Sequence, residues 1–255
     1  MRRIFLLSLL FICSSGVRAA DGPLTVLFIT GADRSHSWKQ QTEETGVILG
    51  EAAGRFAPTV QNGYAILDRP ADMAAYDAIL LTGSFWDTPD RGNPKAEVFT
   101  LSDAQATNLV DYVKAGHGFY AQHLGNASWQ GNAAFSDLCG RRWKGGSSGH
   151  PARRPFETRI ADPAHPITAG ITPFTTDDEC YTGLGIYREV GILVTGLSES
   201  SKKDEPLLMA SAYGAGRVVV CTFGHDRKAL QVPQVRTVIR RSVEWVATGA
   251  VSIAK

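Results

Sequence analysis

Three of the six histidines follow segments that have the apolar composition of buried strands. They are His36, His123 and His225. Ligands of an open parallel sheet bind beyond the carboxyl ends of its strands, so we expect these imidazoles at one edge of such a sheet. Glu179 and His150 lie in other connecting segments that can reach the same edge. The sequence therefore predicts a cluster of titratable groups that is assembled from several loops.

Imidazole and carboxylate groups in one cluster suit two kinds of chemistry. An imidazole titrates near neutral pH and a carboxylate neighbour raises its pKa, so the pair can move protons on a sugar. Neutral imidazoles with a carboxylate can instead hold zinc or a similar divalent metal, with a position open for substrate. The spacing supports no local metal motif, because every ligand would come from a different loop. The catalytic candidates are His36, His123, Glu179 and His225, and a metal, if one binds, is expected at His36, His123 and His225.

Aromatic and polar residues in the same loops are candidates for contact with a substrate. The face of an indole ring packs against the C–H groups of a sugar, although a single tryptophan more often packs in a core. We expect at least one tryptophan to line the site. The candidate substrate-binding residues are Trp38, Trp86, Gln122, His150 and Asp226.

Five arginines surround the glycine-rich loop 145–149. Such a run is more often a solvated face than a binding site, and the alternative is that it holds an acidic sugar. The arginines are Arg141, Arg142, Arg153, Arg154 and Arg159.

Strand-like and helical segments alternate along the first half of the chain and predict an α/β fold. The run LTVLFIT (Leu24 to Thr30) has the continuous apolar character of a strand buried on both faces. In the second half, Gly214-Ala215-Gly216 predicts a hairpin turn. We therefore expect a mainly parallel sheet with an antiparallel edge. The other expected strands are 77–82, 118–122, 156–160, 192–195, 207–212 and 217–223, and the expected helices cover 40–54, the segment after the capping box at Ser102, and a C-terminal stretch that ends at Gly249.

Eight stretches of the chain, between about residues 24 and 249, resemble the ThuA-like family, which is associated with trehalose and sugar use. They are VLFITGADRSHSW, YDAILLTGSFW, LVDYVKAGHGFYAQHLG, RWKGGSSGHP, DPAHPITAGI, DDECY, YGAGRVVVCTFGHD and RRSVEWVATG. The resemblance implies a three-layer, flavodoxin-like sheet of the class I glutamine amidotransferase type. It also implies a carbohydrate or an oxidised (keto) sugar as the ligand.

The resemblance to the amidotransferase fold also implies what the chain lacks. His123 takes the place of the cysteine nucleophile on the strand-to-helix elbow, and His225 is the counterpart of the histidine that activates it. Cys139, Cys180 and Cys221 do not follow a suitable strand. A thiolate needs an accessible elbow beside a base, so we do not expect a cysteine-dependent glutamine amidotransferase. Lyase, isomerase or hydrolase activity stays open, and the alternative is a non-catalytic periplasmic sugar-binding module.

The N-terminus predicts export. A basic start precedes a short apolar run, and Val17-Arg18-Ala19 offers a cleavage site. We expect residues 1–19 to be a signal peptide, residues 20–255 to form one ThuA-like domain, and the mature chain to be periplasmic or secreted. A lipid on Cys13 is disfavoured, because the bulky Ile12 precedes it.

Composition argues against some classes of binding partner. The net charge is +1, so nothing points to nucleic acid, and no later stretch is long and apolar enough to span a membrane. A small sugar is the expected partner, and the sequence leaves the oligomeric state open. Cys139 and Cys180 are the pair considered for a disulfide, which a domain of this size does not require.

Overall fold

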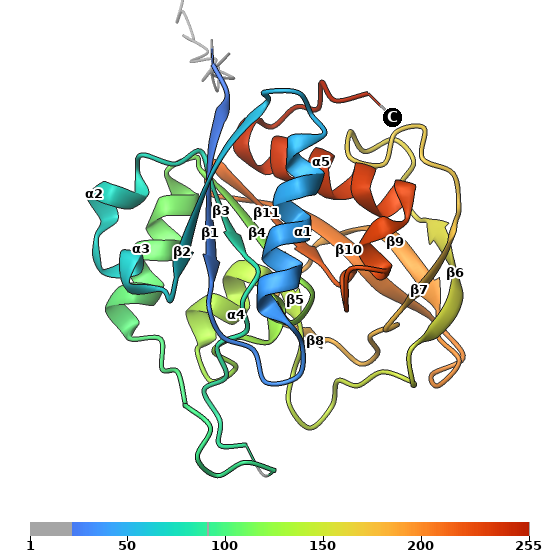
Figure 1. Cartoon of the computed structure of the whole chain (residues 1–255), viewed down its shortest axis with the longest axis horizontal. Helices are drawn as coiled ribbons and strands as arrows, with labels where there is room; N and C mark the ends of the chain where they lie inside the picture. Colours follow the sequence, from blue (N-terminus) through green and yellow to red (C-terminus); the bar gives the residue numbers. More distant parts are fainter. Residues whose placement is uncertain (1–21, 91, 255) are drawn as a thin grey trace, which may run out of the picture.

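A nine-stranded mixed sheet runs through the computed structural model, which describes residues 22–90 and 92–254 (Figure 1). The strand order is β2-β1-β3-β4-β11-β10-β9-β6-β7, and β5 pairs with β8 in a separate small sheet. The strands are β1 Leu24–Thr30, β2 Phe56–Asn62, β3 Ala78–Leu81, β4 Gly118–Gln122, β5 Arg141–Arg142, β6 Arg154–Ile160, β7 Thr175–Asp178, β8 Gly185–Ile186, β9 Gly191–Leu197, β10 Asp204–Tyr213 and β11 Gly216–Cys221. The helices are α1 Trp38–Gly50, α2 Pro70–Met73, α3 Asp103–Lys114, α4 Ala133–Cys139 and α5 Pro233–Thr248, with short 3-10 turns η1 Ala65–Asp68, η2 His123–Ala127 and η3 Ala229–Gln231.

Helices cover both faces of the parallel part of the sheet, which comprises β2, β1, β3, β4 and β11. Side chains of a strand alternate between its two faces, so each buried strand contributes to two cores. Phe28 and Tyr120 pack on the side of α1 and α5, whereas Ile29 and Phe119 pack on the side of α3 and α4. The three layers and the mainly parallel sheet confirm the α/β fold class predicted from the sequence.

The other part of the sheet is antiparallel. β10 and β11 form the hairpin expected at Gly214–Gly216, and β9, β6 and β7 continue the sheet from β10. Gly216 is required by close packing, because a Cβ there would lie 2.0 Å from the carbonyl oxygen of Val113. The antiparallel edge expected from the hairpin is therefore confirmed.

Two strands of the large sheet, β2 and β7, were not expected from the sequence, and neither were the two-residue strands β5 and β8 of the small sheet. β2 and β7 form the two edges of the large sheet. An edge strand contacts solvent along one side, so its sequence need not be apolar. The sequences FAPTVQN and TTDD accordingly lack the buried runs that identified the inner strands. Asp178 is the last residue of β7, and Glu179 follows it directly.

The helix ends follow local capping chemistry. Ser102 and Gln105 form the expected reciprocal capping box at the start of α3. Gly249 ends α5 in the left-handed conformation, with φ of +80°. The helix expected over 40–54 begins earlier, at Trp38, because Ser37 caps it, and ends at Gly50.

Two further expectations concern cysteines and membranes. Cys139, Cys180 and Cys221 are free and buried, so the pair considered for a disulfide is unbonded. Across residues 22–90 and 92–254, each helix is too short or too polar to cross a membrane. The expected signal peptide lies outside the described residues.

Candidate functional site

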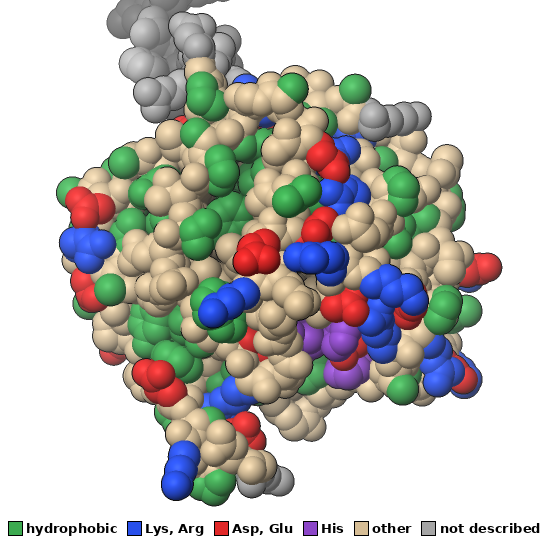
Figure 2. Space-filling model, in the orientation of Figure 1, with side chains coloured by type: hydrophobic (Ala, Val, Ile, Leu, Met, Phe, Trp, Pro, Cys, Tyr) green, Lys and Arg blue, Asp and Glu red, His purple; other side chains and the backbone are tan. Residues whose placement is uncertain are grey.

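The carboxyl ends of β1, β4 and β11 deliver three histidines to one place. His36 lies in the β1–α1 loop, His123 follows β4 directly, and His225 follows β11. Glu179 enters from the antiparallel side, one residue after β7. One ligand atom from each of these four residues lies within 4.8 Å of the others. Figure 2 shows histidine side chains grouped at one spot on the surface, beside acidic and basic side chains. We call these four residues the histidine cluster.

His123 occupies the sharp turn from β4 into η2. Its backbone has φ of +46°, an uncommon value for a residue with a side chain, and its ring is fully buried. Nδ1 donates to the Thr222 carbonyl oxygen at 2.7 Å, since a carbonyl can only accept. In the neutral ring, Nε2 therefore keeps its lone pair, and it faces the rest of the cluster.

His36 lies between the other two imidazoles. Its Nε2 is 2.9 Å from His225 Nδ1 and 3.4 Å from His123 Nε2. Its ring stands almost perpendicular to both of theirs, at 86° and 87°. Asp33 shapes the loop, because one of its carboxylate oxygens accepts the backbone N–H groups of Ser35 and His36.

Asp178 and Glu179 are adjacent acidic residues whose carboxylates make different contacts. Asp178 is buried, and its carboxylate accepts the backbone N–H groups of Gly224 and His225, which fixes the loop after β11. Glu179 turns into the histidine cluster, where Oε1 lies 3.0 Å from His225 Nδ1 and Oε2 lies 3.4 Å from His123 Nε2. Consecutive residues of an extended chain point to opposite sides, which explains the division.

Burial and charge act against each other in this cluster. Burial lowers the pKa of His36, but hydrogen bonds and charge interactions with Asp33 and Glu179 outweigh it and raise the pKa to about 9. Burial raises the pKa of Glu179, and the neighbouring imidazoles of His123, His225 and His36 reverse this and hold it far below its usual range. Glu179 is thus ionised, and its negative charge favours the protonated form of the neighbouring His36.

The family profile ThuA, described as trehalose utilisation, matches residues 25–246. The chain belongs to this family. Its fold is similar to that of a ThuA-like protein from Parabacteroides merdae, with 20% identity, a TM-score of 0.75, and coverage of 91% of this chain and 93% of that one. A ThuA-like protein from Bacteroides uniformis shares 13% identity, with a TM-score of 0.64 and coverage of 91% and 96%.

A part of a larger enzyme shares the same fold. The β-galactosidase from Rahnella sp. R3 is 13% identical, with a TM-score of 0.58, over 88% of this chain and 32% of that protein. At these identities the likeness concerns the fold alone. Among the curated proteins, none matches the chain.

The other expected site residues of this ThuA family member lie at different distances from the cluster. His150 is the nearest, with Nδ1 3.6 Å from Glu179 Oε1. Gln122 is the buried last residue of β4 and accepts a hydrogen bond from Thr45. Asp226 forms an ion pair with Arg153 at the rim.

Four of the five tryptophans lie in segments that directly follow strands, and they take different positions. Trp38 lines a polar cavity of about 370 Å³ that Asp33 also lines. Trp86 packs against the core with the Arg34 guanidinium 5.8 Å from its ring centre. Trp129 is buried in the core. Trp143, which also lies in a loop after a strand, packs edge-on against Tyr181.

Tyr181 is a site residue that the sequence analysis missed. Its hydroxyl lies 3.0 Å from His123 Nε2, and its ring stacks against His150. The side chain is fully buried. Its position two residues after Glu179 is the signal that could have found it, because alternate residues of an extended segment face the same side.

The arginine run is not one solvated face. Arg142 is fully buried, and its Nε donates to the Asn126 carbonyl oxygen at 2.8 Å, with further bonds to carbonyl groups of the same turn. The interpretation as a solvated face is therefore wrong for Arg142, since the turn after β4 needs a buried donor. Arg154 and Arg159 form ion pairs with Glu199 and Asp204.

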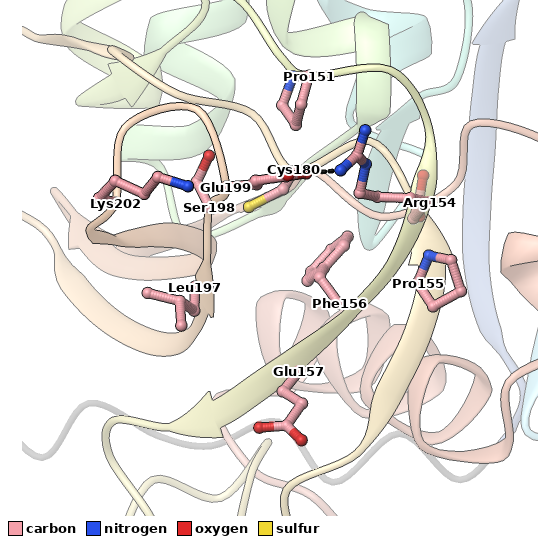
Figure 3. Close-up of a pocket in the computed structure, with 11 residues that line it drawn as sticks. Pro151, Arg154, Pro155, Phe156, Glu157, Cys180, Leu197, Ser198, Glu199 and Lys202 are labelled. Atoms are coloured by element: carbon pink, nitrogen blue, oxygen red, sulfur yellow. Dashed lines mark ion pairs between the residues drawn. The ribbon is translucent and has the colours of Figure 1, made fainter.

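A second, more apolar cavity of about 640 Å³ lies beyond the Asp178–Cys180 segment, between β6 and the β9–β10 turn (Figure 3). Phe156, Leu197 and Cys180 line it, and the Arg154–Glu199 ion pair crosses it. Burial raises the pKa of the Cys180 thiol to about 12, so this thiol stays protonated. The same shift holds for Cys139 and Cys221. The thiols are thus unsuited to nucleophilic attack.

Proposed function

We propose that this ThuA family protein is an exported enzyme that acts on a carbohydrate or an oxidised (keto) sugar at the histidine cluster. The observation that carries the proposal is the convergence of His36, His123, His225 and Glu179 within 4.8 Å. Four buried or half-buried titratable groups from four loops cost stability, and such arrangements concentrate at functional sites.

The cluster contains the groups that proton transfer requires. Without a bound metal, the raised pKa of His36 makes it a proton donor at neutral pH, and the low pKa of Glu179 keeps its carboxylate ionised. Epimerisation or elimination on a sugar needs a donor and an acceptor on either side of a C–H or C–O bond. Tyr181 Oη adds a further hydroxyl donor at 3.0 Å from His123 Nε2.

The polar cavity beside the cluster suits a hydroxylated ring. Trp38 offers an aromatic face there, and Asp33, Asn93 and Glu97 offer hydrogen-bonding groups. Asp33 also lies 3.5 Å from His36, so the cavity and the cluster adjoin each other. The family description, trehalose utilisation, supports a sugar as the ligand.

A non-catalytic sugar-binding module is the second candidate. The cavity of about 640 Å³ favours it, because this volume suits a small ligand and no histidine is among the residues that line it. Binding in that cavity would leave the histidine cluster without a role.

The experiment is a screen of the purified mature chain against sugars and 3-keto sugars, with binding and turnover measured together. The enzyme proposal expects turnover that His123→Asn abolishes while the variant stays folded by circular dichroism. Binding without turnover, retained by His123→Asn and lost in Phe156→Ala, would support the binding module instead.

Export has its own test. The basic start, the apolar run and the small residues around Val17-Arg18-Ala19 support cleavage near Ala19. Mass measurement of the mature chain should give a start at Ala20. An intact Met1, or a lipid on Cys13, would contradict it.

A further inference from the structure

The four residues of the histidine cluster are arranged like the ligands of a single ion. We infer that His36, His123, His225 and Glu179 bind one divalent first-row transition-metal ion, of which zinc is the representative. This inference rests on the proposed function only for the part that the ion would take in turnover; the site itself follows from geometry.

The spacing of the ligand atoms fits such an ion. A tetrahedral ion with metal–nitrogen bonds of about 2.0–2.1 Å places neighbouring ligand atoms roughly 3.4 Å apart. His36 Nε2 lies 2.9 Å from His225 Nδ1 and 3.4 Å from His123 Nε2. Glu179 Oε2 lies 3.4 Å from His123 Nε2 and 3.7 Å from His36 Nε2. These four separations scatter around the expected value, and all the ligand atoms of the cluster lie within 4.8 Å of one another.

An outer hydrogen bond holds His123 in the orientation that a metal requires, and a carboxylate lies beside the second ring nitrogen of His36. A metal-binding histidine usually donates its second N–H to a carbonyl or carboxylate, which fixes its tautomer. His123 does this with the Thr222 carbonyl at 2.7 Å. His36 Nδ1 lies at an ion-pair distance of 3.5 Å from Asp33 Oδ1, without a hydrogen bond between them, and Asp33 is itself anchored by the backbone of the loop.

Hydrogen bonding within the cluster is incomplete without a cation. His36 Nε2 faces His225 Nδ1, His123 Nε2 and Glu179 Oε2 together, although one ring nitrogen carries at most one proton. Glu179 Oε2 is buried and has no hydrogen-bond partner among the described residues. An unpaired buried carboxylate oxygen is costly, and an ion at the centre would satisfy it.

The donor set indicates the class of ion. Imidazole nitrogens suit zinc, copper, iron and nickel, whereas calcium and magnesium prefer oxygen ligands alone. Such an ion, when bound, supplies a Lewis acid for a sugar oxygen. Tyr181 Oη, 3.0 Å from His123 Nε2, would then lie beside it and donate to an oxygen of the bound ligand.

The test measures the metal directly. The purified mature chain is analysed for metal content, stripped with a chelator, and titrated with Zn²⁺ by calorimetry. We expect one ion per chain, and a visible absorption spectrum typical of nitrogen ligation when Co²⁺ replaces Zn²⁺. Glu179→Gln, which keeps the size of the side chain, should weaken Zn²⁺ binding by more than about 100-fold, because losing only an outer partner costs roughly 10–100-fold. Asp33→Asn should fall in that smaller range.

Control variants separate this inference from misfolding. His117 stacks on Tyr112, away from the cluster, so His117→Gln should bind Zn²⁺ like the unchanged chain. Stoichiometry well below one ion, or unchanged binding by Glu179→Gln with a normal circular dichroism spectrum, would overturn the inference. Full sugar turnover by the metal-free chain would overturn the part assigned to the ion in turnover and leave the proposed function standing. Tight Zn²⁺ binding without any sugar turnover would support the metal site and count against the enzyme.

Discussion

The parallel and antiparallel parts of the sheet contribute differently to the molecule. The parallel part ends in His36, His123 and His225, whose ring nitrogens face one another. The antiparallel part contributes Glu179 to that cluster. It also forms the apolar cavity that Phe156 lines. The segment that carries Glu179 separates the two, because its neighbours Asp178 and Cys180 line the cavity.

The difference between the two parts teaches how position determines chemistry. Parallel strands align their carboxyl ends, so loops far apart in the sequence bring side chains to one edge. Antiparallel strands have no such shared end, and their contribution depends on how a single segment, Asp178–Tyr181, crosses toward that edge. We therefore propose catalysis at the histidine cluster and expect changes in the cavity to affect stability first.

Glu179→Gln gives the largest expected effect. Losing the central carboxylate should reduce sugar turnover by roughly 10²–10⁴-fold, the usual contribution of general acid–base groups. Steady-state kinetics on the substrate from the screen checks this. Glu199→Gln is the matched control, since Glu199 is exposed and pairs with Arg154 across the cavity. Equal losses in both variants would remove the distinction between the two parts.

Phe156→Ala should affect folding more than chemistry. The ring packs against Gly196, where a Cβ would lie 2.8 Å from it, and the residue is 9% exposed. Truncation should lower the free energy of unfolding by about 3 kcal/mol. Denaturant unfolding measures this loss, and turnover per folded molecule should stay within a few-fold. Leu197→Ala, at an exposed position of the same cavity, serves as the control for surface change.

Metal removal should destabilise the chain through the histidine cluster alone. An ion present at 100 times its dissociation constant stabilises the folded state by about 2.7 kcal/mol. Chelation should therefore lower the melting temperature of the unchanged chain and of Phe156→Ala, but not that of Glu179→Gln. Thermal unfolding followed by circular dichroism makes this comparison, and an equal shift in all three would argue against the site.

The smallest expected effect is that of the cysteines. Replacing Cys139, Cys180 and Cys221 singly with Ser or Ala should leave turnover largely intact, because none of them lies at the turn after β4. Kinetics on each folded variant checks it. Loss of turnover in one variant without unfolding would restore a thiol mechanism.

The sequence predicted the inner strands and the positions of the histidines because both depend on local pattern. LTVLFIT is continuously apolar, and His123 directly follows a strand that is buried on both faces. The edge strands β2 and β7 were not predicted, because one side of each contacts solvent and their sequences therefore lack a continuous apolar run. The contacts of Tyr181 and Arg142 were not predicted for another reason. Their partners are His123 and the carbonyl groups of the turn after β4, and tertiary packing determines both.

The most direct test of a shared site is a double-mutant cycle with His123→Asn and His225→Asn. Asparagine keeps some hydrogen bonding and removes the titratable ring. The two residues share Glu179 and His36 as partners, so we expect strongly non-additive losses of turnover, with the second substitution costing little after the first. Strictly additive losses, or full activity in either single variant, would contradict the claim that the histidine cluster works as one unit.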